Sequence, residues 1–330
     1  RIVRVLLIKT SSLGDVIHTL PALTDAARAI PGIQFDWVVE EGFAEIPAWH
    51  PAVAQVIPVA IRRWRKNLWQ TLKNGDWRRF KARLGENDYD LVIDAQGLLK
   101  SALLTRYVKG PIAGLDRNSA REPIACRFYD RLYAVPKEQH ALERTRQLFA
   151  QALGYPLPAS IGDYGLDRAA MATPGQQPYL LFLHGTTWAS KHWPEADWRA
   201  LAERMSAQGW AIRLPWGNAL EQARAERIAA GIENAAVLSK LNLAGVAKVI
   251  AGASACVAVD TGLGHLAAAL DVPTISLYGP TLPGRVGAYG RGQVHLCASG
   301  PNAGSGDRNK ACFDGLGAEH IGPERPRSAD

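Results

Sequence analysis

The stretch LLIKTSSLGDVIHTLPAL, residues 6–23, contains the change of pattern that decides the fold. Its apolar run predicts a strand that is buried on both faces, and the small residues of TSSLGD predict a turn. A helix follows from Asp15, and Pro21 should kink this helix or delay its regular start. In α/β proteins a ligand usually binds where such a strand ends and the next helix begins. The stretch therefore predicts both a fold class and a candidate site.

The same alternation of strand and helix continues along the chain and predicts parallel sheets covered by helices on both faces. In the first half we expect further strands at 35–40 and 89–96, with helices after Gly97 and around Gln139. A stretch rich in Pro and Gly follows at 155–178. Beyond it we expect strands at 179–184, 211–214, 255–260 and 273–279, and helices around 198–207, from 221, over 243–251 and over 262–270.

The length of 330 residues indicates two domains rather than one. We expect an N-terminal Rossmann-like domain at 1–160, a linker at 161–178, and a second Rossmann-like domain at 179–290. The segment 291–330 has many glycines and no sustained periodicity, so it is predicted to be irregular or disordered. Two such α/β halves would face each other across a cleft between the carboxyl ends of their sheets.

Composition excludes several classes of protein. The chain is 47% hydrophobic and 21% charged, and no apolar run approaches the ~18 residues that a membrane-spanning helix needs. We recognise neither a secretory signal nor a zinc site. The four cysteines are far apart, and the apolar surroundings of one of them favour a reduced thiol in the cytoplasm. They are Cys126, Cys256, Cys297 and Cys312.

Positive charge is concentrated in one block, residues 62–83, which carries nine Lys or Arg and a single Asp. The formal net charge of the whole chain is +7, so the remainder is almost neutral. Four aromatic residues lie among these cations. Three interpretations stay open: nucleic-acid binding by phosphate contacts and stacking, a membrane-surface or lipid-phosphate site, and a solvated helix with ordinary apolar anchoring.

The turn before Asp15 matches neither GxGxxG nor GxxxxGK[ST], so it lacks the fingerprints of nicotinamide and P-loop sites. Asp15 itself has two possible roles, an N-cap of the helix or a general base. The roles compete in part, because a carboxylate that accepts capping hydrogen bonds is a weaker base.

Two further strand ends carry polar residues. In FLHGTTWASKHWP, residues 182–194, hydroxyls, amides and the Lys191 ammonium suit a phosphate or diphosphate, although a plain surface loop is equally consistent. In VAVDTGLGHLAAAL, residues 257–270, a helix N-terminus at Thr261 and Gly262 offers amides to an anion. His265 lies about 200° from the apolar stripe that begins at Leu263, so we expect it to point away from the core. Glu221 could bind ribose hydroxyls or be a solvated helix start.

Several motifs resemble the ADP-heptose:lipopolysaccharide heptosyltransferase family: KTSSLGDVIHTLPALTDA, VIDAQGLLKSAL, KHWPEADW and VDTGLGHLAAALDVPTISLYGPT. The resemblance covers residues 3–290 and is closer to the enzymes that add the first heptose of the inner core than to those that add the second. It implies a GT-B fold, ADP-L-glycero-β-D-manno-heptose as donor, and a Kdo sugar on lipid A as acceptor. It also implies inversion without a metal or other cofactor, at the cytoplasmic face of the inner membrane. We expect a monomer with no nucleic-acid partner.

The resemblance also assigns roles to residues. Asp15 corresponds to the catalytic base, and Lys191 to the group that meets the diphosphate. The residues implied in donor binding are Thr186, Thr187, Lys191, Glu221, Leu241, Asp260, Thr261, Gly262 and His265. Those proposed for the acceptor are Arg62, Arg63, Arg65, Lys66 and Arg121.

Three rival functions differ from this interpretation. Another nucleotide-sugar transferase of the same fold would keep the donor motifs and change the basic block. A nicotinamide dehydrogenase would need a glycine fingerprint that is missing here. A non-catalytic anion-binding module predicts that Asp15 can be lost without consequence and that binding follows salt concentration alone.

Overall fold

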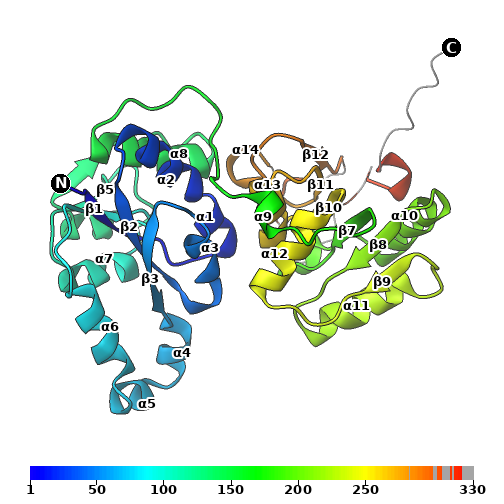
Figure 1. Cartoon of the computed structure of the whole chain (residues 1–330), viewed down its shortest axis with the longest axis horizontal. Helices are drawn as coiled ribbons and strands as arrows, with labels where there is room; N and C mark the ends of the chain where they lie inside the picture. The colour runs from blue at the N-terminus through cyan, green and yellow to red at the C-terminus, as the bar shows by residue number, and fades with distance from the viewer. Residues whose placement is uncertain (282, 300–302, 307–312, 314–315, 322–330) are drawn as a thin grey trace. The chain divides into compact units, whose positions relative to one another are not determined.

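The structure is a computed structural model that describes residues 1–281, 283–299, 303–306, 313 and 316–321. The chain forms two compact units, residues 1–166 and 167–330 (Figure 1). Each unit has its own parallel sheet and its own apolar core. The boundary between the units falls within the segment 161–178 that was predicted as a linker.

The sheet of unit 1 has its first strand near the centre, in the order β3-β2-β1-β4-β5-β6. The apolar side chains of this strand, residues 5–8, are fully buried, as expected for a strand with helices on both faces. The strands are β1 (Arg4–Ile8), β2 (Gln34–Glu40), β3 (Val53–Val59), β4 (Leu91–Asp94), β5 (Ile112–Leu115) and β6 (Arg131–Tyr133). The helices are α1 (Leu13–Ile17), α2 (Leu20–Ala29), η1 (Glu41–Phe43), α3 (Glu45–Ala48), α4 (Ile61–Lys66), α5 (Leu68–Lys73), α6 (Asp76–Leu84), α7 (Leu99–Leu104), η2 (Thr105–Tyr107), η3 (Pro123–Phe128) and α8 (Ala141–Leu153).

The first predicted helix is two helices, α1 and α2. Pro21 lies in the first turn of α2, where its missing amide costs nothing, so the expected interruption is confirmed. The expected helix start at Asp15 is wrong by two residues. The N-cap of α1 is Ser12, and Asp15 is the third residue of the helix.

A buried ion pair joins α2 to α8. The Arg146 guanidinium donates to both carboxylate oxygens of Asp25, at 2.7 and 3.1 Å, and neither side chain is more than 3% exposed. Arg146 also donates to Glu143 at 3.0 Å and to the Ser160 carbonyl at 2.9 Å. The neighbouring carboxylates raise the pKa of Arg146 further above its usual value. This two-pronged pairing fixes how the two helices lie against each other.

Unit 2 repeats the topology of unit 1. Its sheet has the order β12-β11-β10-β7-β8-β9, so β7 holds the place that β1 has in the first sheet. The strands are β7 (Tyr179–Leu183), β8 (Ala211–Leu214), β9 (Ala235–Val237), β10 (Ala255–Val259), β11 (Thr274–Tyr278) and β12 (Gln293–Cys297). The helices are α9 (Arg168–Met171), η4 (Ala189–Lys191), α10 (Glu195–Ala207), α11 (Ala219–Ala229), α12 (Leu243–Gly252), α13 (Gly262–Ala269), α14 (Pro283–Val286) and η5 (Ala318–His320).

Strand β12 corrects the prediction that the chain becomes irregular after residue 290. It pairs in parallel with β11 over five residues, from Thr274↔Gln293 to Tyr278↔Cys297. Further on, Ala318 and Ile321 are buried in the core of unit 2. A short edge strand takes its hydrogen bonds from the neighbouring strand, so it needs no long apolar pattern of its own. The rest of the predicted tail, residues 300–302, 307–312 (which include Cys312), 314–315 and 322–330, lies outside the described residues.

Candidate active site

The residues predicted to bind the donor lie on loops that follow four neighbouring strands of unit 2. These strands, β10, β7, β8 and β9, are adjacent in the sheet and parallel. Their carboxyl ends therefore share one edge, where open α/β sheets bind ligands. Thr186, Thr187 and Lys191 follow β7, Glu221 follows β8, Leu241 follows β9, and Asp260, Thr261, Gly262 and His265 follow β10.

Asp260 connects the loops after β7 and β10. Its carboxylate lies 3.0 Å from the Lys191 ammonium and accepts a hydrogen bond from the Thr281 hydroxyl at 2.7 Å. Its backbone carbonyl accepts from the Thr186 hydroxyl at 2.9 Å. The Lys191 ammonium also lies 4.0 Å from the centre of the Trp188 ring. A carboxylate and an aromatic face thus hold the lysine in place. Its ammonium has three protons to donate, which is more than this one ion pair uses.

Glu221 is close to the loop after β7. The residue is in the first turn of α11, where its carboxylate accepts from the Gly217 amide at 3.1 Å, and its own amide donates to Asn218. A Cβ atom at Gly185 would lie 2.6 Å from the Glu221 carboxyl carbon. Gly185 therefore allows the carboxylate to approach the β7 loop as closely as it does. The contacts show Glu221 in a capping role, with its second oxygen accepting from the Asn218 side-chain amide at 3.5 Å.

The helix α13 begins at Gly262, with Thr261 as an extended N-cap residue, and both are half-buried. The prediction that His265 points away from the core is wrong, because His265 is only 8% exposed. Helix α13 packs against α12, β10 and β11, so it has no broad solvent-facing side. Leu263, predicted to lie in the apolar stripe, is only half-buried. Of the other donor residues, Thr187 is exposed and Leu241 is half-buried just before α12.

Unit 1 has a pocket of about 690 Å³ at the carboxyl ends of β1 and β4, the two strands at the centre of its sheet. Asp15, expected as the base, and Arg121, expected to bind the acceptor, both line it. The Asp15 carboxylate accepts hydrogen bonds from the Ser12 amide at 3.2 Å and hydroxyl at 3.4 Å, both to Oδ2. Other polar lining residues are Lys9, Ser11, Gln96, Lys100, Glu122, Arg144 and Thr145.

Three cations of this pocket were missed from the sequence, namely Lys9, Lys100 and Arg144. Burial lowers the pKa of Lys9, which donates to the Ala95 carbonyl at 3.2 Å, while Asp15 acts in the opposite direction. Burial also lowers the pKa of Arg144, whose guanidinium donates to the Ser119 and Pro136 carbonyls. Lys9 could have been found, since it directly follows the first strand. Arg144 gave no signal, because only the packing of α8 brings it to the pocket.

A buried network supports the floor of the pocket. The carboxylate of Asp94, at the end of β4, accepts from the Tyr129 hydroxyl, from Ser101 at 3.0 Å and from the Gln96 amide at 3.0 Å. Burial raises the pKa of Asp94. The Gln96 side chain in turn accepts from the Thr10 amide and hydroxyl, at 2.8 and 2.6 Å. The loops after β1 and β4 are therefore fixed to each other.

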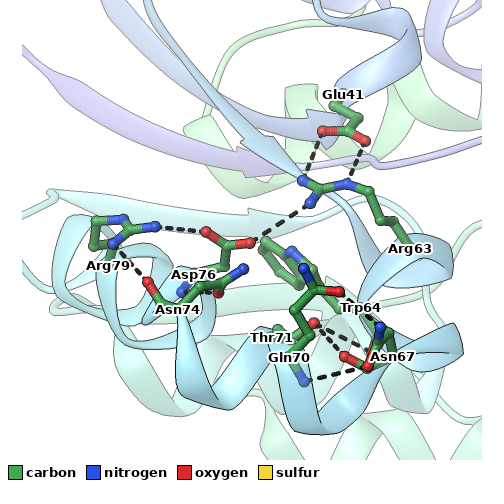
Figure 2. A network of polar contacts seen from close by, with 9 residues as sticks. All are labelled: Glu41, Arg63, Trp64, Asn67, Gln70, Thr71, Asn74, Asp76 and Arg79. Carbon is green, nitrogen blue, oxygen red and sulfur yellow. Dashed lines mark hydrogen bonds and ion pairs between the residues drawn. The ribbon is translucent and has the colours of Figure 1, made fainter.

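The basic residues of α4 do not line this pocket. Arg62, Arg65 and Lys66 are exposed, and none of them has a carboxylate within ion-pair distance in the part of the chain that is described. Arg63 differs, because it bridges Glu41, at 3.1 and 3.2 Å, and Asp76, at 3.5 Å (Figure 2). The structure thus ties Arg63 to the protein itself and leaves its three neighbours available.

No group of three or more His, Cys, Asp and Glu side chains within the described ranges is arranged to hold a metal ion. Among the helices that the structure describes, none is long and apolar enough to cross a membrane.

The family model of glycosyltransferase family 9 (heptosyltransferase) matches residues 77–313. The chain belongs to this family. Lipopolysaccharide heptosyltransferase 1 of Pseudomonas aeruginosa is 78% identical over 303 residues, 91% of this chain and 85% of that protein. The protein of the same name in Escherichia coli K12 is 54% identical over 88% of this chain and 92% of its own length. Lipopolysaccharide heptosyltransferase 2 of that strain is 24% identical, which confirms the closer resemblance to the first enzyme.

A solved family 9 structure, E. coli heptosyltransferase WaaC with ADP, has a TM-score of 0.88 and 53% identity, and covers 90% of this chain and 94% of that one. The same enzyme with ADP-2-deoxy-2-fluoro heptose has a TM-score of 0.85 at 52% identity, with the same coverage. These likenesses, together with the two six-stranded parallel sheets, confirm the predicted α/β GT-B class.

Proposed function

We propose that this family 9 glycosyltransferase moves L-glycero-D-manno-heptose from ADP-heptose to the first Kdo of Kdo-modified lipid A, in synthesis of the lipopolysaccharide inner core. The observation that carries the proposal is the gathering of all the predicted donor residues on one edge of the unit 2 sheet, after four adjacent strands. The high identity to lipopolysaccharide heptosyltransferase 1 of P. aeruginosa supports the choice of donor and acceptor.

The roles along that edge follow from the chemistry of each group. Amides at the start of α13 and the Lys191 ammonium would bind the diphosphate. The Glu221 carboxylate would accept hydrogen bonds from ribose hydroxyls, and the apolar side chain of Leu241 would cover the adenine. Asp260 would keep Lys191 in position through their 3.0 Å ion pair. Unit 2 is accordingly the proposed donor-binding domain, and unit 1 the acceptor-binding domain.

The proposed reaction is a single displacement with inversion. Asp15 takes the proton from a Kdo hydroxyl through Oδ1 while that oxygen forms a bond to the anomeric carbon. The bond from the anomeric carbon to the phosphate oxygen breaks, and ADP leaves with the electron pair. Lys191 and the α13 amides meet the charge that develops on the diphosphate, so the proposed mechanism needs no metal.

The acceptor is anionic, and unit 1 supplies two groups of cations. Lys9, Lys100, Arg121 and Arg144 line the pocket that contains Asp15 and would bind the Kdo carboxylate. Arg62, Arg65 and Lys66 are exposed on α4 and would bind the lipid A phosphates. Arg63 we propose as a positioning residue, because its guanidinium is already paired with two carboxylates. A lipid acceptor places the enzyme at the cytoplasmic surface of the inner membrane.

The test is ADP release from ADP-heptose with Kdo-modified lipid A, in the presence of EDTA. Asp15→Asn keeps a capping acceptor but no base, whereas Asp15→Ala removes both. We expect kcat to fall by at least about 10²-fold in both variants, with donor affinity retained. Asp88→Asn, an exposed carboxamide substitution in the same unit, is the matched control.

Other outcomes point to the rival functions. Full activity of Asp15→Asn would leave Asp15 as a capping residue only. Turnover with a different acceptor, but none with Kdo-modified lipid A, would indicate another ADP-sugar transferase. Salt-dependent acceptor binding without any turnover would favour the non-catalytic module.

A further inference from the structure

Helix α5 has its apolar side chains on the outside. Leu68, Trp69 and Leu72 are 63%, 79% and 59% exposed, whereas Thr71 is only 6% exposed. Residues 68, 69 and 72 lie within about 100° of each other around a helix, and residue 71 lies roughly 60° beyond the edge of that arc. An ordinary surface helix turns its apolar face inward, so this pattern is inverted.

Hydrogen bonds order both ends of α5 (Figure 2). The Thr71 hydroxyl donates to the Asn67 carbonyl at 2.9 Å, and the Asn67 side chain accepts from the Gln70 amide. After the helix, Arg79 donates to the Asn74 carbonyl at 2.9 Å and is paired with Asp76. The apolar face is therefore presented by an ordered turn.

The base of this projection is packed into unit 1. Trp64, Trp77 and Phe80 form a cluster with ring centres 5.3–6.0 Å apart, and Trp77 also contacts Tyr107. Trp64 and Phe80 are buried in the core of the unit. In Figure 1, α4 and α6 lead to α5 at the end of unit 1. The exposed side chains of α5 are thus carried on a rigid support.

Exposed cations flank the apolar face along the chain. Arg65 and Lys66 end α4, Lys73 ends α5, and Arg78 lies on α6; all four are exposed. The one acid of residues 62–83, Asp76, is paired with Arg79 and Arg63. Exposed Trp and Leu side chains with exposed Lys and Arg close by in the sequence match the interface of an anionic bilayer, where apolar groups enter the acyl boundary and cations contact lipid phosphates.

We propose that the α5 face, defined as Leu68, Trp69 and Leu72, inserts into the surface of an anionic phospholipid bilayer. The flanking lysines and arginines attract the face to the surface, and the three apolar side chains supply the affinity that salt does not screen. This inference rests on the proposed function, since that function places the acceptor in a membrane. It assigns the contact to a site separate from the pocket of Asp15.

The test is co-flotation of the full chain with phosphatidylcholine vesicles that contain no lipid A. The vesicles include 30% phosphatidylglycerol, roughly the anionic fraction that a polybasic surface responds to. The triple variant Leu68→Ser/Trp69→Ser/Leu72→Ser should lower the partition coefficient by at least about tenfold. Lys73→Gln or Arg78→Gln should each lower it by about fivefold at low salt. The control is Ile124→Ser/Leu132→Ser/Leu157→Ser, which removes three apolar side chains that are 41–51% exposed on separate segments of the same unit.

A second measurement separates this proposal from the proposed function. With Kdo-modified lipid A from which the acyl chains have been removed, the α5 triple variant should transfer heptose at the wild-type rate. Absence of transfer by the wild type would refute the proposed function while leaving the vesicle result intact. Equal flotation of triple variant and wild type would overturn the membrane proposal. The membrane proposal would also be overturned if the wild type formed a dimer and the triple variant did not, because the face would then bind a second copy.

Discussion

The Lys191 ammonium lies 3.0 Å from the Asp260 carboxylate, and this pair joins the loops that follow β7 and β10. Both side chains are mostly buried, at 15% and 12% exposed, so the lysine is oriented before any ligand arrives. A positive charge that is already in place does not need to reorganise when negative charge develops on a leaving diphosphate. The pair would allow a lysine in a polar loop to take the catalytic role proposed for it.

Replacing Lys191 by Gln should therefore lower kcat by roughly 10²- to 10³-fold, as the loss of a preorganised charge does elsewhere. The variant also leaves Asp260 without its cation, so the affinity for ADP should fall as well. Steady-state kinetics and ADP titration calorimetry measure the two effects separately. Lys248→Gln, at an exposed position on α12, is the control and should behave as the wild type. A Lys191→Gln enzyme with wild-type kcat would remove the lysine from the mechanism.

Substitution of Gly185 should affect the donor site indirectly, through Glu221. A Cβ atom there would lie 2.6 to 2.8 Å from the carboxylate atoms of Glu221, so Gly185→Ala must displace that carboxylate. Since displacement of a positioned group by about 1 Å can cost up to 10²-fold, we expect the donor KM to rise by roughly tenfold or more. Acceptor KM should stay the same. Gly42→Ala, where a Cβ meets nothing within 4 Å, provides the comparison. An unchanged donor KM in Gly185→Ala would separate Glu221 from ribose binding.

The central strands were predictable because their sequences are nearly continuous apolar runs. Such runs are typical of strands that are covered on both faces. That reasoning found β1, β7 and β10, whose carboxyl ends carry the candidate catalytic and diphosphate groups, and β4, which lies beside β1 at the pocket of Asp15. It missed β5, β6 and β9, which have only three or four residues and depend on a neighbour for their hydrogen bonds. It also missed β3, whose Pro58 is tolerated because β3 is an edge strand.

The wrong or missed predictions for the site residues also arise because local sequence patterns do not show contacts between distant parts of the chain. His265 was assigned from the periodicity of one helix, but packing on α12, β10 and β11 decides its exposure. Arg144 reaches the pocket of Asp15 only because α8 packs there, which no local pattern records. The block at 62–83 was recognised by its charge, whereas the division between paired Arg63 and its exposed neighbours needed the positions of Glu41 and Asp76.

The buried pair of Asp25 and Arg146 predicts a large effect on stability. Asp25→Asn would leave the guanidinium buried without its bidentate partner, and breaking such a pair typically costs about 3 to 5 kcal/mol. Urea unfolding of the variant should show this loss in the free energy of unfolding of unit 1. The exposed pair of Arg28 and Asp163 is a natural control, with side chains 65% and 50% exposed. Arg28→Gln should cost less than about 1 kcal/mol, and equal losses in the two variants would contradict the argument.

Two buried histidines predict how stability depends on pH, one in each unit. His50 accepts from the Ala52 amide through Nδ1 at 3.1 Å, so its Nε2 donates to Thr24, 2.8 Å away. His184 donates from Nε2 to the Pro215 carbonyl at 2.9 Å. Burial lowers the pKa of both from the ordinary 6.5 to about 4. Each is therefore neutral in the folded protein and takes up a proton when it unfolds below pH 6.5.

The sign of the effect follows from this difference in proton binding. The stabilisation is complete above about pH 7 and is lost as the pH falls from 6.5 toward 4, because the unfolded state then binds more protons. Between pH 7.5 and pH 5.0 each histidine should lower the free energy of unfolding by about 2 kcal/mol. Urea titrations at the two pH values measure this change. In His50→Gln the contribution of His50 is removed, so unit 1 should lose less stability between the two pH values than it does in the wild type. An identical pH dependence in variant and wild type would show that His50 is not the group that titrates.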